Sequence, residues 1–139
     1  MQLCDLSAVE IRDHVFSKRA SAVEVLESCL QRIKQVDGRP GELESGPETK
    51  EDTERVHAFI TLTEGAARAQ AEMVDKMIVN GEDPGPLAGV PATIKDVFCV
   101  KDTPSTIGSR ILANFISPYT ATPVARMQSA GAVLLGKVN

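Results

Sequence analysis

The chain has 139 residues, which is room for one domain with a modest core, and its hydrophobic content of 42% is ordinary for a soluble globular protein. Aromatic residues make up only 4% of the chain and Trp is absent, so aliphatic side chains must fill the core. The formal net charge of -4 argues against a broad nucleic-acid-binding surface.

Neither a membrane span nor a secretory leader is predicted. No run approaches the ~18 consecutive apolar residues of a membrane-spanning helix, and the first residues lack the basic and apolar regions of a secretory signal. Cys4, Cys29 and Cys99 are odd in number and widely spaced, so they indicate neither a disulfide framework nor a zinc site. His14 and His57 lie far from any cysteine pair. We therefore expect a reducing, cytoplasmic setting and no metal.

Two helices are predicted at the N-terminus by their capping boxes. Ser7–Glu10 opens the first helix, with Leu6 and Ile11 placed as a hydrophobic staple, and Ser21–Glu24 opens the second. The second helix, which ends at Asp37, carries one apolar stripe: Ala22, Leu26, Cys29, Leu30 and Ile33. The stripe could cover the chain's own core, which is the favoured interpretation, or dock on a partner.

An acidic insert is predicted at about 37–55. Residues 37–54 contain seven acidic and two basic residues, and Leu43 is the one large aliphatic side chain among them. Such a segment cannot bury enough apolar surface to offset its ordering entropy, so we expect a flexible, solvated linker.

A further helix is expected from Thr63, as its cap, to about Asn80, with Gly81 as its stop. Residues 57–62, before it, have strand-like or extended character. The apolar face predicted for the helix consists of Ala66, Ala69 with Gln70, Met73 and Met77.

The stretch Gly85–Asp96 leads from a Gly/Pro-rich loop into a strand predicted over 89–97, in which apolar and other residues alternate. It places Lys95 beside Asp96 near the end of the strand. Taken alone, Lys95 is typical of a solvated lysine at a strand end.

The last two elements predict a βαβ unit. Thr122-Pro123 begins a helix, which should end at Gly131 with Val124, Met127 and Ala130 facing inward. The apolar run 132–136 is typical of a parallel strand buried on both faces, and the unit should be right-handed. Because no further strand follows in the sequence, we expect this strand to have an open edge and an uncovered apolar face at 133–135.

One motif imitates a phosphate-binding loop. Gly131–Lys137 matches the spacing G-x-x-x-x-G-K, but Val138 stands where Ser or Thr would bind Mg²⁺. The intervening residues are strand formers and no helix follows, so nucleotide binding is not expected.

Three segments, 85–96, 103–112 and 118–139, resemble the amidase signature family, and most closely its tRNA-dependent amidotransferase branch. The resemblance extends over nearly the whole chain except the acidic insert. It implies an α/β fold in which N-terminal helices precede the start of a mixed, mainly parallel sheet covered by helices. Residues 1–139 would then form the N-terminal part of a single amidase domain.

The resemblance also implies a Ser–cis-Ser–Lys triad, whose lysine matches Lys95. A lysine that accepts a proton must be neutral, and burial disfavours its charged form. Both triad serines belong to a Gly/Ser-rich segment downstream in the family. The serines at 105, 109, 117 and 129 match neither of them. This chain alone is therefore expected to be inactive.

For the branch that it resembles, the implied reaction is release of ammonia from glutamine. The ammonia would pass to a partner subunit that amidates ATP-activated Glu-tRNA(Gln). ATP, Mg and tRNA would then belong chiefly to the partner, and no cofactor is expected on this chain. Two alternatives stay open: a general hydrolase of small amides, and a non-catalytic scaffold that binds partner subunits.

Overall fold

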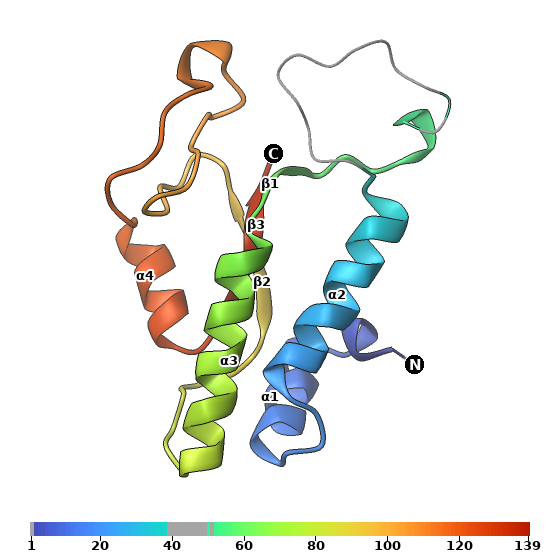
Figure 1. Cartoon of the computed structure of the whole chain (residues 1–139), viewed down its shortest axis with the longest axis vertical. Helices are drawn as coiled ribbons and strands as arrows, with labels where there is room; N and C mark the ends of the chain where they lie inside the picture. Colours follow the sequence, from blue (N-terminus) through green and yellow to red (C-terminus); the bar gives the residue numbers. More distant parts are fainter. Residues whose placement is uncertain (1, 39–49, 51) are drawn as a thin grey trace.

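Helices lie on both faces of a three-stranded mixed sheet in the computed structural model, which describes residues 2–38, 50 and 52–139 (Figure 1). The strands are β1 (Phe59–Leu62), β2 (Pro91–Lys95) and β3 (Val133–Val138). The helices are α1 (Ala8–Phe16), α2 (Ala22–Val36), α3 (Glu64–Asn80) and α4 (Thr122–Ser129), with short 3-10 turns η1 (Leu3–Asp5), η2 (Asp52–Glu54) and η3 (Arg110–Leu112). Most of the predicted acidic insert, at 39–49 and 51, lies outside the described residues.

Both predicted capping boxes are confirmed. At the start of α2, the Glu24 carboxylate accepts a hydrogen bond from the Ser21 N–H at 2.8 Å, and the Ser21 hydroxyl accepts one from the Glu24 N–H at 3.1 Å. The Asp75 carboxylate of α3 accepts the N–H groups of Ala22 and Val23, at 2.6 and 3.1 Å. The start of α2 is thus satisfied from within its own turn and from the neighbouring helix.

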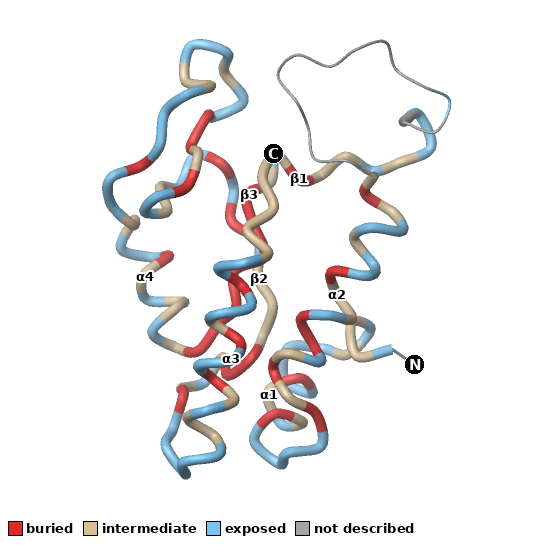
Figure 2. The backbone as a smooth tube through the Cα atoms, viewed as in Figure 1, coloured by how far each residue is buried: buried red, intermediate tan, exposed pale blue. Residues whose placement is uncertain are grey.

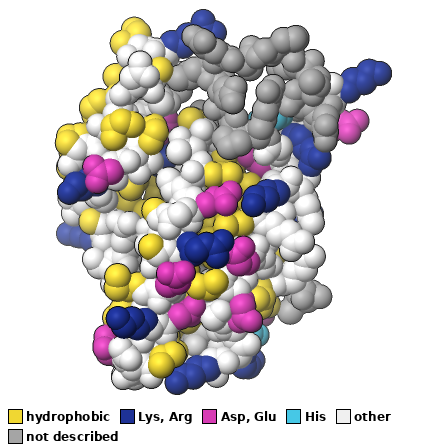
Figure 3. Space-filling view, viewed as in Figure 1, with side chains coloured by type: hydrophobic (Ala, Val, Ile, Leu, Met, Phe, Trp, Pro, Cys, Tyr) yellow, Lys and Arg dark blue, Asp and Glu magenta, His cyan; other side chains and the backbone are white. Residues whose placement is uncertain are grey.

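The apolar stripe of α2 packs against the chain's own core rather than facing outward. Ala22, Leu26 and Leu30 are buried in the main cluster, together with residues of α1, α3 and β3. Figure 3 shows acidic and basic side chains interspersed over the outer surface of α2 and α3. Hydrophobic side chains gather instead over the loop that follows β2, where the exposed ones include Ile107, Ile111, Phe115, Ile116 and Tyr119.

The apolar face predicted for α3 is wrong. The buried residues are Ala67, Ala71 and Val74, whereas Met73 is 64% exposed. Alanines occur around much of this helix, so the sequence pattern does not single out one face. Packing against α2 and β3 selects the face that carries Ala67, Ala71 and Val74.

β3 is the central strand, with β1 antiparallel on one edge and β2 parallel on the other. Val133 and Leu135 pack in the main core with α1, α2 and α3, while Leu134 packs with Ile94 and Val124 on the α4 side. Figure 2 shows β3 as a buried strand between the helical layers. The expected open edge and uncovered apolar face are therefore wrong, because residues 59–62 supply the second neighbouring strand.

A bulge in β3 changes which face its later residues occupy. Ala92 of β2 pairs with Leu134 and Thr93 pairs with Gly136, so Leu135 is an extra residue. Regular alternation would put Lys137 on the face of Val133 and Leu135. The extra residue instead pairs Lys137 with Ile94, so its side chain lies on the α4 side of the sheet.

Within the described part of the chain, no helix has both the length and the apolar character needed to cross a bilayer.

Candidate active site

The carboxyl ends of β2 and β3 meet at one end of the sheet, which we call the carboxyl edge. Lys95 is the last residue of β2. A pocket of about 100 Å³ lies at this edge. It is lined by Lys95, Asp96, Val97, Ile107, Gly108, Val138 and Asn139. Ligands of parallel α/β sheets commonly bind beyond the carboxyl ends of the strands, so the place suits a reactive group.

The Lys95 side chain is exposed rather than buried. The burial that a neutral, proton-accepting lysine requires is therefore not supplied by the described residues alone. The structure places Lys95 in the lining of the pocket.

The neighbouring acid, Asp96, is buried and paired with a lysine from the other strand. Asp96 is 2% exposed and Lys137 is 1% exposed, and the Lys137 Nζ lies 3.0 Å from Asp96 Oδ1. The same ammonium donates to the Ser105 hydroxyl at 3.0 Å and to the Pro104 carbonyl at 3.1 Å. The sequence pattern places Lys137 in the false phosphate-binding motif and gives no sign of this ion pair.

Thr106 completes the surroundings of the Asp96 carboxylate. Asp96 Oδ2 accepts the Thr106 N–H at 3.0 Å and the Thr106 hydroxyl at 2.7 Å. Burial alone raises the pKa of the Asp96 carboxyl, but the hydrogen bonds from Thr106 and the nearby positive charge of Lys137 outweigh it. The pKa of Asp96 is held below its ordinary value, so the carboxylate is ionised at neutral pH.

Ser105 and Lys137 have the separation of a nucleophile and its base, but the surroundings exclude that role. The Lys137 Nζ pairs with the Asp96 carboxylate and donates hydrogen bonds to the Pro104 carbonyl and the Ser105 hydroxyl, so its contacts are those of a donor rather than of a base. Ser105 is only 2% exposed, so a substrate cannot reach its hydroxyl. Of the two lysines at this edge, only Lys95 is exposed to the pocket.

The phosphate-binding motif is also excluded by geometry. Residues 133–138 form β3, and Gly136 lies against the β1 backbone rather than in a loop. Among the described residues, no group of three or more His, Cys, Asp or Glu side chains is placed to hold a metal ion.

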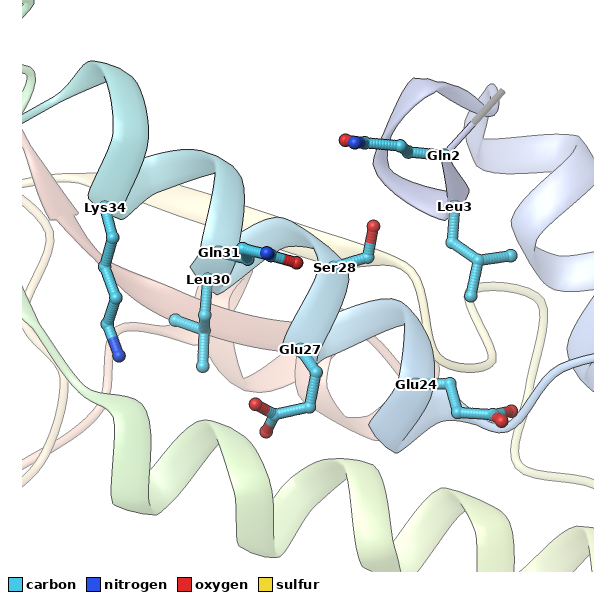
Figure 4. A pocket seen from close by; sticks show the side chains of 8 residues that line it. All are labelled: Gln2, Leu3, Glu24, Glu27, Ser28, Leu30, Gln31 and Lys34. Carbon is cyan, nitrogen blue, oxygen red and sulfur yellow. The ribbon is translucent and has the colours of Figure 1, made fainter.

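A wider surface depression of about 710 Å³ lies between η1 and α2, far along the chain from Lys95 (Figure 4). Its charged side chains already have local roles. Glu24 caps α2, Glu27 pairs with Arg68 of α3, and the Lys34 Nζ lies 3.9 Å from a Glu64 carboxylate oxygen. These contacts leave no converging set of groups for catalysis, so the carboxyl edge of the sheet is the better candidate.

Comparison with known proteins defines the class. The family model described as Amidase matches residues 48–139, more than half of the chain. The chain therefore belongs to the amidase family.

Among curated proteins, the chain is similar to the A-subunit of glutamyl-tRNA(Gln) amidotransferase. It is 44% identical to that of Desulfotalea psychrophila over 138 residues and 42% identical to that of Cyanothece sp. over 130 residues. These alignments cover 99% and 94% of this chain, but 25% and 24% of the relatives. The chain thus spans about a quarter of the length of these relatives.

Solved amidases share the fold. Native peptide amidase from Stenotrophomonas maltophilia matches with a TM-score of 0.80 and 26% identity, over 97% of this chain and 25% of that chain. A bacterial aryl acylamidase of the amidase signature family matches with a TM-score of 0.79 and 30% identity, over 96% and 25%.

Proposed function

We propose that this chain forms the N-terminal part of the amide-hydrolysing subunit of a glutamyl-tRNA(Gln) amidotransferase, and that Lys95 is its general base. The observation that carries the proposal is the place of Lys95: exposed, in a pocket, at the carboxyl end of β2. The identity of 40% or more to several of these A-subunits supports the glutamine-hydrolysing branch.

In the proposed reaction, neutral Lys95 accepts a proton through a bridging serine while a second serine attacks the amide carbonyl of glutamine. Backbone N–H groups near the nucleophile stabilise the oxyanion. Both serines come from the region that the relatives have beyond this quarter of their length. The ammonia passes to a partner subunit, where ATP, Mg and tRNA bind, in a cytoplasmic hetero-oligomer.

A general hydrolase of small amides is the second candidate. It is favoured by the match to peptide amidase and aryl acylamidase, whose folds align over nearly all of this chain. The two candidates differ in the amide that is cleaved, and they assign the same role to Lys95.

A chimeric full-length protein tests the proposal. Residues 1–139 replace the corresponding quarter of the Desulfotalea psychrophila relative, and ammonia release from glutamine is measured with that organism's partner subunits. Lys95→Ala should lower turnover by ~10²–10⁴-fold, as loss of a general base does. Lys95→Arg should fail as well, because arginine stays protonated.

Lys101→Ala is the matched control, since Lys101 is an exposed lysine in the turn after β2 and should tolerate the change. Turnover near that of the unsubstituted chimera in either Lys95 variant would remove Lys95 from the catalytic role. A folded chimera that cleaves small amides but not glutamine would favour the general hydrolase, and a folded chimera that cleaves neither would count against both.

A further inference from the structure

Three segments that are far apart in the sequence converge on the Asp96–Lys137 ion pair. Asp96 follows the last residue of β2, Lys137 lies in β3, and Pro104 to Thr106 belong to the loop between β2 and α4. The Asp96 N–H also donates to the Val138 carbonyl at 2.8 Å. Backbone and side chain of Asp96 are therefore both fixed, immediately after Lys95.

Most of the buried polar groups here have hydrogen-bond partners, whereas Asp96 Oδ1 has none among the described residues and is held by the charge of Lys137 at 3.0 Å. Lys137 offers three N–H donors, and its ammonium lies within 3.0–3.1 Å of Asp96 Oδ1, the Ser105 hydroxyl and the Pro104 carbonyl. The other oxygen of the Asp96 carboxylate accepts two hydrogen bonds from Thr106. Moving Asp96 or Lys137 would leave the other charge in the interior without its partner, so the arrangement favours one geometry.

Stability alone does not account for a buried ion pair. The cost of removing both charges from water is comparable to their attraction, and well-packed neutral side chains of similar volume often serve as well or better. The pair does, however, determine geometry at the edge where the proposed base is exposed. At that edge, β2, β3 and the loop between β2 and α4 must also keep fixed positions relative to one another.

We propose that Lys137 is a positioning residue: by holding Asp96 and the 104–106 loop, it fixes the place from which Lys95 reaches the substrate. This inference rests on the proposed function, since it needs Lys95 to act in the reaction. Lys137 touches neither the pocket nor a substrate, and it acts through Asp96, the residue next to Lys95. A misplacement of about 1 Å in a reacting group can cost ~10²-fold in rate.

The test compares single and paired substitutions in the chimeric full-length protein with its partner subunits. Lys137→Met and Asp96→Asn each leave one buried group without its partner. The double variant Asp96→Asn/Lys137→Met removes both charges with little change in volume, so it should fold. We expect the folded double variant to lose ~10²-fold in kcat for glutamine, with KM changed less than ~3-fold.

A merely structural ion pair gives a different result. In that case, activity follows the folded fraction, and the folded double variant has the kcat of the unsubstituted protein, which would overturn the proposal. Lys76→Met is the matched control, because Lys76 is an exposed lysine of α3 and should leave both kcat and KM unchanged.

Thr106→Val keeps the inference testable if the double variant does not fold. It removes one hydroxyl donor to Asp96 and leaves both charges in place. We expect ~10-fold lower kcat at unchanged KM, and an unchanged kcat in this folded variant also overturns the proposal. The Lys95→Ala variant distinguishes failure of the proposed function from failure of the positioning role. If it is active, the proposed base is wrong, and if it alone is inactive, only the positioning role is wrong.

Discussion

The three thiols of the chain have different chemical surroundings. Burial, followed by the proximity of Cys4, raises the pKa of Cys29 to about 11. The opposite holds at Cys99, where hydrogen bonds from Ser117 and then Tyr119 lower the pKa of the thiol. Since the thiolate is the reactive form, Cys99 has the larger reactive fraction near neutral pH.

We therefore expect iodoacetamide at pH 7–8 to alkylate Cys99 well before Cys29. Mass spectrometry of the digested chain, sampled over time, measures each rate separately. A denatured sample is the control, in which the two rates should converge. Equal rates in the folded chain would show that these surroundings do not govern the reactivity of the thiols.

Gly136 shows how closely the strands approach one another. A Cβ added at this position would overlap the carbonyl oxygen of Thr61 and would lie 3.1 Å from the Leu62 Cα. Because these are backbone atoms of β1, they can move only by disturbing the pairing of the strands. Gly136→Ala should lower the free energy of unfolding by about 1–3 kcal/mol, as overpacking does.

Gly65→Ala is the natural control, since a Cβ at that position of α3 meets nothing within 4 Å. It should be neutral or stabilise the helix by up to about 1 kcal/mol. Chemical denaturation of both variants gives the comparison, and a Gly136→Ala protein as stable as the Gly65→Ala protein would contradict the close approach.

At the scale of elements, the Asp96 carboxylate connects β2, β3 and the loop before α4. Its pKa is lower in the folded chain than the ~3.9 of an unfolded Asp. The folded state therefore gains stability from this group above about pH 4, and loses that gain as the pH falls through the lowered value. Acid should weaken the connection of the three segments.

Asp96→Asn tests this linkage. At neutral pH it leaves Lys137 buried without its counter-ion, which typically costs about 3–5 kcal/mol. The difference in unfolding free energy between the original and the variant should shrink below about pH 4, where the unfolded chain protonates Asp96 before the folded chain does. Denaturation series at pH 7 and pH 3 measure it, and a difference that stays constant would contradict the assigned ionisation.

Several elements are predictable because their signals are local. The capping boxes at Ser7 and Ser21 fix two helix starts, Gly81 marks the end of α3, and Thr122-Pro123 marks the start of α4. The apolar run of β3 identifies a buried strand. In each case, neighbouring residues contain the hydrogen-bonding or burial information.

The features that the sequence does not reveal depend on contacts between distant residues. Asp96 and Lys137 are 41 positions apart, and no local pattern says that their side chains meet. The pairing of residues 59–62 with β3 joins still more distant residues, since Leu62 and Gly136 are 74 positions apart, so the sequence predicts an open edge where β1 lies. The bulge at Leu135 is likewise not predicted, because the apolar run has no residue that marks it.

For the whole molecule, the chain corresponds to about a quarter of its curated relatives. The proposed reaction takes both serines from outside these residues, so we expect the purified 139-residue chain to release no ammonia from glutamine or asparagine. A coupled ammonia assay measures this. The Lys95→Ala chain, purified identically, is the control for contaminating amidases. Ammonia release by the original chain but not by this control would show that the chain holds a nucleophile of its own.

The bulge in β3 has a consequence for how this domain can change. Six residues of β3 lie along five residues of β2, so Leu135 adds one core side chain without a partner in register. The mismatch is absorbed between Leu134 and Gly136, and pairing resumes before Lys137. Leu135 packs in the main core, whereas Lys137 lies on the α4 side of the sheet. Inserting a single residue after Gly136 would therefore exchange the environments of a buried ammonium and an apolar side chain.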